Sequence, residues 1–258
     1  MELMTETIKR EKGKFSTIIL AAGKGTRMSS PLAKVLHPIC KRPMLSYPVA
    51  LARELGSKET VVIVGYQAEK VKESFKDEEV VFVHQREQMG TGHAVLQARD
   101  KFVGFNGDIL ILCGDVPLLP PSTVKGLLNC HFSTGAAITV LTTVPDTPTG
   151  YGRIVKENHD DVLRIVEERD ATAEEKKIRE INTGIYCVQS RFLFEAVADI
   201  GNKNAQGEYY LTDIFEIAGE RGYSARSFMT GNPDEVMGIN TMDDLKRAGR
   251  IIAGRSGE

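Results

Sequence analysis

Short apolar runs alternate along the chain with segments whose apolar residues recur at helical spacing. The apolar runs are continuous and rich in β-branched residues, which is typical of buried strands. They predict strands at 17–20, 60–64, 80–83, 108–113, 136–144, 180–186 and 224–229. The amphipathic segments predict helices at 44–55, 67–75, 123–132, 211–218 and 242–253. This alternation favours an α/β fold in which a Rossmann-like, mostly parallel but mixed sheet carries helices on both faces.

The pattern changes near residue 145. Hairpin-like strands are expected from there, at 152–155 and 162–167. We interpret residues 15–258 as a single domain, with halves at about 15–144 and about 145–240 and a C-terminal helix over 241–258. Residues 1–14 are polar and lack the apolar core of a signal peptide, so we interpret them as a mobile leader.

The first strand leads directly into a glycine-rich turn. Residues 17–20 are followed by A-A-G-K-G-T-R-M, and Lys34 comes shortly afterwards. Glycine and alanine leave backbone N–H groups open to a ligand, and successive N–H groups can bind an anion. Arg27 and Lys34 would add two cations suited to phosphate. Neither the P-loop spacing nor the dinucleotide fingerprint is present, and an ordinary tight turn with solvated charges remains the alternative.

A second polar loop, at 85–94, leaves a predicted strand and enters a predicted helix. Ligands of open α/β sheets bind at the carboxyl ends of strands. The amides of Gln85 and Gln88 can pair with the polar edge of a base, and Gly90 allows close approach. A polar loop with a helix cap at Thr91 is the alternative.

An acidic residue follows the predicted strand at 108–113. Asp115 stands at the carboxyl end of that strand, beside a glycine. Mg²⁺ commonly takes one or two protein carboxylates and fills its shell with phosphates and water. Asp115 is therefore a candidate metal ligand, and an Asx turn before Pro117 is the alternative.

Composition narrows the class of protein. The formal net charge is -2, so there is no global basic field for nucleic acid, and an anion site has to be local. The cysteines, at 40, 113, 130 and 187, form no C-x-x-C pair and are typical of reduced thiols. No apolar run approaches membrane-spanning length. We expect a cytoplasmic protein that acts on small molecules and binds neither nucleic acid nor a membrane.

Five segments together resemble the sugar-nucleotide pyrophosphorylases, a family of nucleotidyltransferases. They are L-A-A-G-K-G-T-R-M with its later lysine at 20–34, Q-R-E-Q-M-G-T-G-H-A at 85–94, T-G-Y-G-R-I at 149–154, N-A-Q-G-E-Y-Y-L-T-D at 204–213 and G-I-N at 238–240. The resemblance extends from about residue 16 to about residue 245. It looks most like the uridylyltransferases that make UDP-N-acetylglucosamine. It implies the nucleotidyltransferase fold, with a sugar-binding β-rich lobe.

The same resemblance implies roles for individual residues. Arg27 and Lys34 would act in catalysis, and Asp115 and Asn240 would bind Mg²⁺. The implied nucleotide-binding residues are Leu20, Ala21, Ala22, Gly23, Lys34, Gln85, Gly90, Thr91, Cys113, Gly114 and Asp115. The implied sugar-phosphate-binding residues are Gly152, Glu167, Asn182, Tyr210 and Thr212. His93 is interpreted as structural.

Two of these assignments have competing explanations. Glu167 and Glu168 would otherwise be interpreted as a solvated pair, although an alternating strand should turn one of them inward. Asn240 or Thr241 could cap the helix predicted at 242–253. The local pattern alone leaves both questions open.

The chain also departs from the family in places. Ala33 stands where the family usually has proline, so the approach to Lys34 would be less rigid. Cys113 stands where many members have tyrosine, which puts one nucleotide contact in question. The hexapeptide repeats of the bifunctional members do not appear, so we expect neither acetyl transfer nor trimers, and a monomer or weak dimer instead.

These features predict a UDP-N-acetylglucosamine diphosphorylase. The resemblance implies transfer of a uridylyl group from UTP to N-acetyl-α-D-glucosamine 1-phosphate, with Mg²⁺ as cofactor and pyrophosphate as second product. Such an enzyme would serve the synthesis of peptidoglycan precursors. The alternatives are the same chemistry with glucose 1-phosphate or dTTP, and a non-catalytic, nucleotide-sensing homologue.

Overall fold

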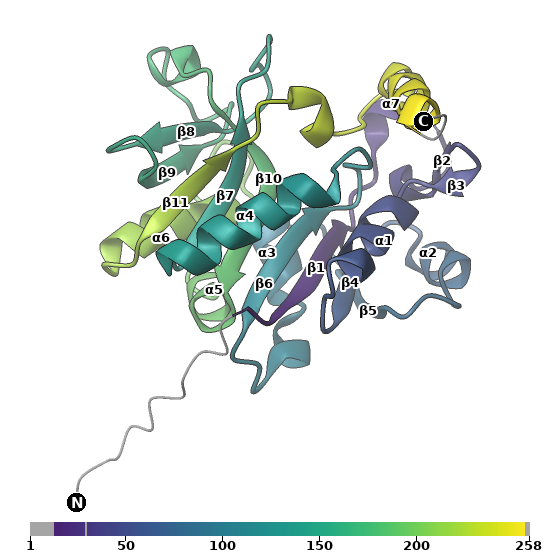
Figure 1. The fold of residues 1–258 in the computed structure, drawn as a ribbon, viewed down its shortest axis with the longest axis horizontal. Coiled ribbons are helices and arrows are strands. Elements are labelled where there is room, and N and C mark those ends of the chain that lie inside the picture. The colour runs from purple at the N-terminus through teal and green to yellow at the C-terminus, as the bar shows by residue number, and fades with distance from the viewer. Residues whose placement is uncertain (1–12, 29, 256–258) are drawn as a thin grey trace, which may run out of the picture.

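A mixed β-sheet forms the centre of the structure (Figure 1). The computed structural model describes residues 13–28 and 30–255, and within them nine strands belong to this sheet. Seven strands follow the order β11-β7-β10-β6-β1-β4-β5. They are β1 (Phe15–Ala21), β4 (Thr60–Val64), β5 (Val81–His84), β6 (Asp108–Cys113), β7 (Ile138–Thr143), β10 (Ile181–Gln189) and β11 (Ala225–Met229). In this row β10 alone runs antiparallel to its neighbours, so the carboxyl ends of the other six strands lie at one edge.

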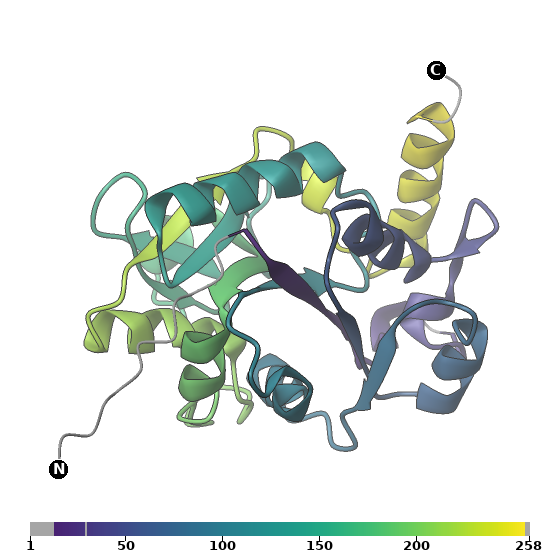
Figure 2. The same ribbon diagram turned by 60° about the horizontal axis from the view of Figure 1, so that its bottom comes forward.

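Helices cover both faces of the sheet (Figure 2). One face packs against α1 (Ser46–Glu54), α2 (Ala68–Ser74) and α4 (Pro121–Thr134). The other packs against α3 (Thr91–Leu96), α5 (Ser190–Ala196) and α6 (Ile214–Glu220). This three-layer arrangement is the one that the alternation of strands and helices predicted.

The central strands carry apolar residues on both of their faces because both faces are buried. Ile18 of β1 lies in the cluster under α3, α5 and α6, whereas its neighbour Ile19 lies in the cluster under α1, α2 and α4. Val61 and Val62 of β4 divide in the same way. Successive side chains of a strand point to opposite faces, so a strand between two helical layers needs apolar residues at every position.

A hairpin extends the sheet beside β10. It consists of β8 (Arg153–Lys156) and β9 (Val162–Val166), which pair antiparallel. Arg153 pairs with Ile181 of β10, and the turn of the hairpin reaches β11 through a bridge between Asp161 and Arg226. Figure 1 shows β8 and β9 on the same side of the molecule as β11. The hairpin predicted from the change of pattern is therefore part of the same sheet.

The C-terminal helix α7 (Met242–Arg255) lies against a segment from early in the chain. Its Ala248 is fully buried in a small cluster with Ile39 and Leu118, and Figure 1 shows it beside the short hairpin of β2 (Pro38–Ile39) and β3 (Arg42–Pro43). Arg255 donates a 2.7 Å hydrogen bond to the Leu118 carbonyl. Within the described residues, no helix combines the length and the apolar character that crossing a membrane requires.

The predicted elements differ from the observed ones mainly at their ends. Helix α1 begins at Ser46, so Pro48 lies in its first turn, where a missing N–H is tolerated. The helix predicted at 211–218 begins with a 3₁₀ turn, Leu211–Asp213, before α6. The short strands β2 and β3 and the helix α5 were not predicted. Of the expected leader, residues 1–12 lie outside the described residues, and the carbonyl of Lys14 accepts a hydrogen bond from Asp108.

Candidate active site

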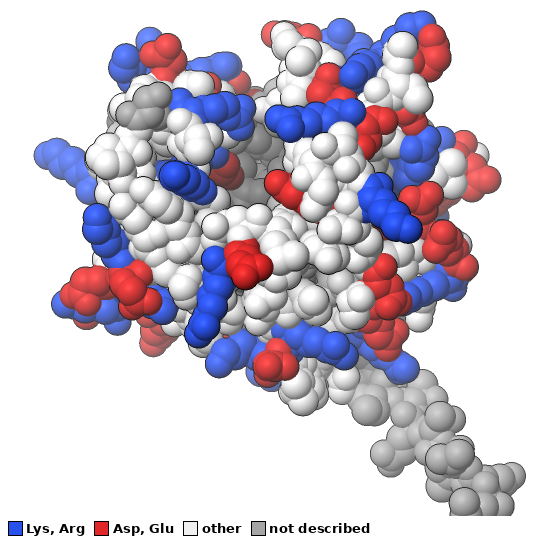
Figure 3. Space-filling model, turned by 180° about the vertical axis from the view of Figure 1, so that it is seen from behind, with Lys and Arg blue, Asp and Glu red and all other residues white. Residues whose placement is uncertain are grey.

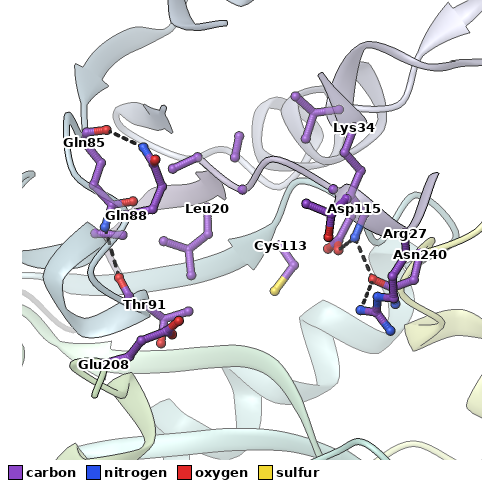
Figure 4. Close-up of a pocket in the computed structure, with 18 residues that line it drawn as sticks. Leu20, Arg27, Lys34, Gln85, Gln88, Thr91, Cys113, Asp115, Glu208 and Asn240 are labelled. Atoms are coloured by element: carbon purple, nitrogen blue, oxygen red, sulfur yellow. Dashed lines mark hydrogen bonds and ion pairs between the residues drawn. The ribbon is translucent and has the colours of Figure 1, made fainter. Parts of the chain in front are cut away.

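A cavity of about 440 Å³ lies at the carboxyl ends of β1 and β6 (Figure 4). Its lining residues are Leu20, Ala21, Ala22, Gly23, Gly25, Thr26, Arg27, Lys34, Val35, Gln85, Gln88, Gly90, Thr91, Ala94, Cys113, Asp115, Glu208 and Asn240. Figure 4 shows the amides of Gln85 and Gln88 and the carboxylate of Glu208 at one end. At the other end, which we call the ionic end, lie Arg27, Lys34, Asp115 and Asn240. One cavity therefore has two polar ends, with the Gln85 end separated from the ionic end.

Charge is concentrated locally. Over the face seen from behind, Lys and Arg side chains are interspersed with Asp and Glu (Figure 3). This mixture fits the formal net charge of -2. An anion that entered the cavity would therefore meet a few placed groups and not a basic field over the whole surface.

The glycine-rich turn requires glycine at one position for two reasons. Gly25 has φ of +67°, which side-chain-bearing residues rarely adopt. A Cβ added there would lie 2.6 Å from the Cβ of Lys34. Gly25 therefore allows the chain to fold back so that Lys34 enters the cavity.

Gly114 does not line the cavity, contrary to the sequence prediction. Its N–H donates a 2.9 Å hydrogen bond to the carbonyl of Leu20, and an added Cβ would lie 3.0 Å from the same oxygen. The residue packs beneath the glycine-rich turn. Its lack of a side chain lets β6 approach β1 at this point, and Asp115 follows directly.

The ionic end places the oxygens of two residues around one ammonium group. Lys34 Nζ lies 2.5 Å from Asp115 Oδ2 and 2.8 Å from Asn240 Oδ1. Arg27 Nη2 donates to the same Asn240 oxygen at 2.7 Å. These hydrogen bonds bring all four candidate residues of this end together, although they come from widely separated parts of the chain.

Tyr151 lies near the same charges. Burial raises the pKa of Tyr151, as do the negative charges of Asp244 and Asp115, whereas Arg27 opposes the rise.

The side chain of Asn240 is free to face the cavity because another residue caps α7. Thr241 Oγ1 accepts a hydrogen bond from the Asp244 N–H at 3.1 Å. In return, Asp244 Oδ2 accepts from the N–H groups of Asn240 and Thr241, at 2.9 and 2.8 Å. This reciprocal arrangement is a capping box. It resolves the alternative left open by the sequence, because the cap is Thr241 and not Asn240.

At the other end, Gln85 is held in a fixed orientation. It is 2% exposed, and its Nε2 donates to the Gly90 carbonyl and contacts His93 Nδ1, both at 3.0 Å. His93 therefore helps to fix the orientation of the Gln85 side chain, in keeping with the structural role predicted for it. Gln88 Nε2 donates to the backbone carbonyl of Gln85 at 3.0 Å, so Gln88 also stabilises the loop itself.

Thr91 is not the helix cap that one explanation of the sequence suggested. The N-cap of α3 is Gly90, with φ of +110°, and the hydroxyl of Thr91 accepts a 3.0 Å hydrogen bond from the Leu211 N–H. A Cβ at Gly90 would lie 2.5 Å from the carbonyl oxygen of Tyr209. The loop therefore packs directly against the 204–213 segment and ties the two predicted substrate regions together.

Four of the predicted sugar-phosphate residues form a cluster next to the cavity. Asn182 N–H donates to the Gly152 carbonyl at 2.9 Å, and an added Cβ at Gly152 would lie 3.6 Å from Glu167 Cδ. Thr212 Oγ1 donates to Glu167 Oε1 at 3.1 Å. Burial raises the pKa of Glu167, while the Thr212 hydrogen bond opposes the rise. A carboxylate in this setting is suited to accept hydrogen bonds from a sugar.

The two neighbouring glutamates have separate partners, so they are not a solvated pair. Glu167 faces Thr212, whereas Glu168 Oε2 accepts a 2.6 Å hydrogen bond from the buried Arg153. Arg153 also donates to the carbonyl of Tyr151. Both acids lie beyond the end of β9 at Val166, so the turn that follows the strand, and not strand alternation, gives them different partners.

Tyr210 shares a second cavity with two members of this cluster. With Asp170, Asp213 and Glu216 it lines this cavity of about 330 Å³, which Glu167 and Thr212 also border. Its hydroxyl makes no hydrogen bond within the described residues, and burial, together with Asp170, raises its pKa to about 12. The structure therefore does not bring Tyr210 to the large cavity with the nucleotide residues.

A family model described as nucleotidyl transferase matches residues 16–234. The chain belongs to the nucleotidyl transferase family. Similar curated proteins include the bifunctional protein GlmU of Geobacter metallireducens, 52% identical over 244 residues, and that of Geotalea daltonii, 52% identical over 240 residues. These matches cover 94% and 93% of this chain but only 51% and 52% of the relatives. The chain thus spans about half the length of the curated relatives it matches.

Solved structures share the fold of this nucleotidyl transferase. A UDP-glucose pyrophosphorylase complexed with UDP-glucose matches with a TM-score of 0.75 and 19% identity, over 94% of this chain and 99% of that one. An inositol-1-phosphate CTP transferase from T. maritima matches with a TM-score of 0.74 and 19% identity, over 94% and 96%. The family and the fold expected from the sequence are therefore confirmed.

The two departures from the family pattern have visible consequences. The Ala33 N–H, which proline would lack, donates a 2.9 Å hydrogen bond to Gln67 Oε1. Cys113 lines the cavity between its two ends, and its thiol donates to the Gly184 carbonyl at 3.4 Å. Burial raises the pKa of this thiol. Cys113 thus contributes a small, neutral side chain to the lining of the cavity.

Sequence reasoning missed one residue that lines the cavity and one that supports it from outside. Glu208 lines the cavity, and Gln67, which does not, contacts the segment before Lys34. Glu208 lies in the quoted 204–213 segment, so its acidic character beside a glycine was an available signal. Gln67 had none, because its partners are backbone groups more than thirty positions away.

Proposed function

We propose that the chain transfers a uridylyl group from UTP to N-acetyl-α-D-glucosamine 1-phosphate, forming UDP-N-acetylglucosamine and pyrophosphate. The observation that carries the proposal is the ammonium of Lys34 between the oxygens of Asp115 and Asn240, at the far end of a cavity from the buried amide of Gln85. A nucleoside triphosphate has this same polarity, with a base at one end and a chain of phosphates at the other. The relatives named GlmU agree with this choice, although the chain matches only about half of each.

The residues of the ionic end fit a magnesium ion. Asp115 Oδ2 and Asn240 Oδ1 already surround one cationic group, Lys34 Nζ. Carboxylate and amide oxygens are hard ligands that suit Mg²⁺, and two protein ligands suffice when phosphates and water complete the shell. Mg²⁺ bound there would neutralise charge on the reacting phosphates.

The protein's own contribution is positioning and charge. In the proposed reaction an oxygen of the sugar phosphate attacks the α-phosphorus of UTP in line, and pyrophosphate leaves. Arg27 and Lys34, with the N–H groups of the glycine-rich turn, hold the triphosphate and the departing pyrophosphate. The attacking oxygen is already anionic, so no general base is required. Holding two reactants in line supplies much of the acceleration.

Substrate choice would rest on the Gln85 end of the cavity and on the cluster of Gly152, Glu167 and Asn182. Gln85 is braced by Gly90 and His93, so its amide can present a fixed pattern to the edge of the base. The sugar would lie over Gly152, Glu167 and Asn182, where a buried acid and an amide can bind its hydroxyl and acetamide groups. A site built to hydrogen-bond a substrate group strongly rejects analogues that lack it.

The test is pyrophosphate release measured with a panel of substrates. UTP with N-acetylglucosamine 1-phosphate should release pyrophosphate only when Mg²⁺ is present. Glucose 1-phosphate in place of the acetylated sugar, and dTTP in place of UTP, are the controls. Release that depends on both preferred substrates supports the proposal. Equal or faster release with glucose 1-phosphate would overturn the proposed sugar, and equal or faster release with dTTP would overturn the proposed base. Binding of UTP without pyrophosphate release from any pair of substrates would favour a nucleotide-sensing role.

A further inference from the structure

The side chain of Gln67 joins the start of α2 to the segment that leads into Lys34. Its Oε1 accepts a hydrogen bond from the Ala33 N–H at 2.9 Å, and its Nε2 donates to the Pro31 carbonyl at 2.8 Å. Both polar groups of the amide are thus bonded to the backbone of one short stretch. We refer to this pair of hydrogen bonds as the Gln67 tether.

The turn that carries Gln67 also contacts the glycine-rich turn. The Tyr66 N–H donates to the Ala22 carbonyl at 3.1 Å, and a Cβ added at Gly65 would lie 2.6 Å from the same oxygen. The ammonium of Lys24 lies 5.5 Å from the centre of the Tyr66 ring, a cation–π contact. Residues 65–67 therefore hold the glycine-rich turn at one point and, through Gln67, the segment before Lys34 at another.

Gln67 adopts a backbone conformation that is costly for its residue type. Its φ of 54° and ψ of 38° lie in the left-handed region, which glycine occupies far more readily. Glycine would relieve the backbone but would remove both hydrogen bonds. Gln67 is half-buried and does not line the cavity. Its side chain therefore contacts the loop and not the proposed substrates.

Ala33 is the residue that needs this support. Its φ of -55° and ψ of 135° are values that proline would adopt without strain, but alanine does not restrict them. Lys34 follows directly, and its ammonium reaches Asp115 and Asn240. A free segment at 31–33 would let that ammonium move relative to the ionic end.

We propose that Gln67 is a positioning residue, which holds residues 31–33 so that the Lys34 ammonium meets the phosphate chain of the nucleotide. This role rests on the proposed function. It predicts that losing the tether lowers turnover without weakening the site for the sugar phosphate, which lies elsewhere. It also predicts that a rigid residue at position 33 can replace the tether.

The first test is Gln67→Gly, which removes the side chain and suits the left-handed backbone. We expect kcat to fall about tenfold, because the charged group is misplaced and not removed. The KM for the sugar phosphate and the melting temperature should not change. Lys41→Gly is the matched control, because Lys41 is an exposed non-glycine residue with φ of +69°, and it should keep wild-type kcat. Wild-type kcat in Gln67→Gly would overturn the proposal.

The second test is rescue. In the double variant Gln67→Gly with Ala33→Pro, the proline ring fixes φ at position 33 and occupies the space that the Gln67 amide has left. We expect most of the lost kcat to return. A merely structural role of Gln67 would not be rescued in this way, so a double variant as slow as Gln67→Gly contradicts the proposal.

Two readouts separate this proposal from the proposed function. Hydrogen exchange at the Ala33 amide should be faster in Gln67→Gly than in the wild type, and unchanged exchange would refute the tether whatever the activity. Calorimetric binding of inorganic pyrophosphate should weaken in Gln67→Gly and recover in the double variant. If the variants show this pattern but the wild type catalyses no uridylyl transfer, the proposed function is refuted and the positioning role is still supported.

Discussion

Lys34 Nζ lies 2.5 Å from Asp115 Oδ2, although 81 residues separate the two in the chain. The pair joins the proposed phosphate-binding cation to the proposed metal ligand. Their side chains are 12% and 29% exposed, so water screens the pair only in part. Removing either partner should therefore affect the chemistry of the ionic end far more than the fold.

Replacing Lys34 with alanine should lower the turnover number by about 100- to 1,000-fold. This is the scale of losing one preorganised charge donor to the transition state. Steady-state pyrophosphate release with saturating substrates measures the effect. Lys70→Ala is the control, because Lys70 is an exposed lysine of α2 that does not line the cavity. A change below about threefold in Lys34→Ala would remove Lys34 from the mechanism.

Replacing Asp115 with alanine should abolish Mg²⁺-dependent activity and leave the fold intact. The carboxylate is one of only two proposed protein ligands, and a hard cation binds poorly without it. A Mg²⁺ titration of pyrophosphate release, with circular dichroism to monitor the fold, checks this. Asp243→Ala, an exposed acid in the first turn of α7, should titrate like the wild type. Full activity in Asp115→Ala would refute the metal assignment.

Replacing Glu167 with glutamine should raise the KM for the sugar phosphate by about tenfold while the KM for UTP stays constant. The change keeps the size of the side chain and its contact with Thr212 but removes the charged acceptor, and hydrogen bonds to charged groups contribute about 1.5–3 kcal/mol. Initial rates at varied concentrations of each substrate separate the two constants. Glu157→Gln, in the exposed turn between β8 and β9, is the control. Equal changes in both constants would argue against a sugar contact.

Asp213 should make the stability of the protein depend on pH. Burial, together with the nearby charges of Glu216, Glu167 and Asp170, raises its pKa to about 6, above the value of about 3.9 for an unfolded aspartate. The folded state therefore binds more protons between these values, and stability falls as pH rises through that window. Asp213→Asn removes this penalty and should be more stable than the wild type at about pH 8, by about 1 kcal/mol after allowance for solvent screening.

Thermal or denaturant unfolding at two pH values tests this prediction. The difference between Asp213→Asn and the wild type should vanish at about pH 2.5, below both pKa values, where the carboxyl is protonated in the folded and the unfolded state. Asp77 is an exposed acid that follows α2, and Asp77→Asn should show no such pH-dependent gain in stability. A gain for Asp213→Asn that is equal at both pH values would mean that packing, not ionisation, is responsible.

The fold and the position of the cavity could be predicted because they depend on local pattern. Continuous apolar runs identify strands that are buried on both faces, and Ile18 and Ile19 do divide between the two faces. The glycine-rich turn and Asp115 both follow such strands. Parallel strands bring their carboxyl ends to one edge, so these segments had to lie near one another.

The capping of α7 needed the tertiary structure. A helix start with Asn240 and Thr241 in succession offers two caps of similar propensity, and the choice depends on which side chain has a better partner elsewhere. Lys34 and Arg27 supply that partner for Asn240, more than 200 positions away. Thr241 is then left to pair with Asp244.

The sequence by itself determined the α/β class, the strands of the sheet and the glycine-rich turn, and it singled out the residues that meet at the ionic end. The class, the strands and the turn follow from periodicity and glycine chemistry, which act over a few residues, whereas Asn240 was singled out only by the motif of the resembled family. Only the tertiary structure decided that β10 runs against its neighbours, that Gly114 packs beneath the turn, and that Tyr210 faces a second cavity. It also decided the partners of Gln67. A side chain that hydrogen-bonds distant backbone leaves no local signal, because any residue can supply a backbone N–H or carbonyl group.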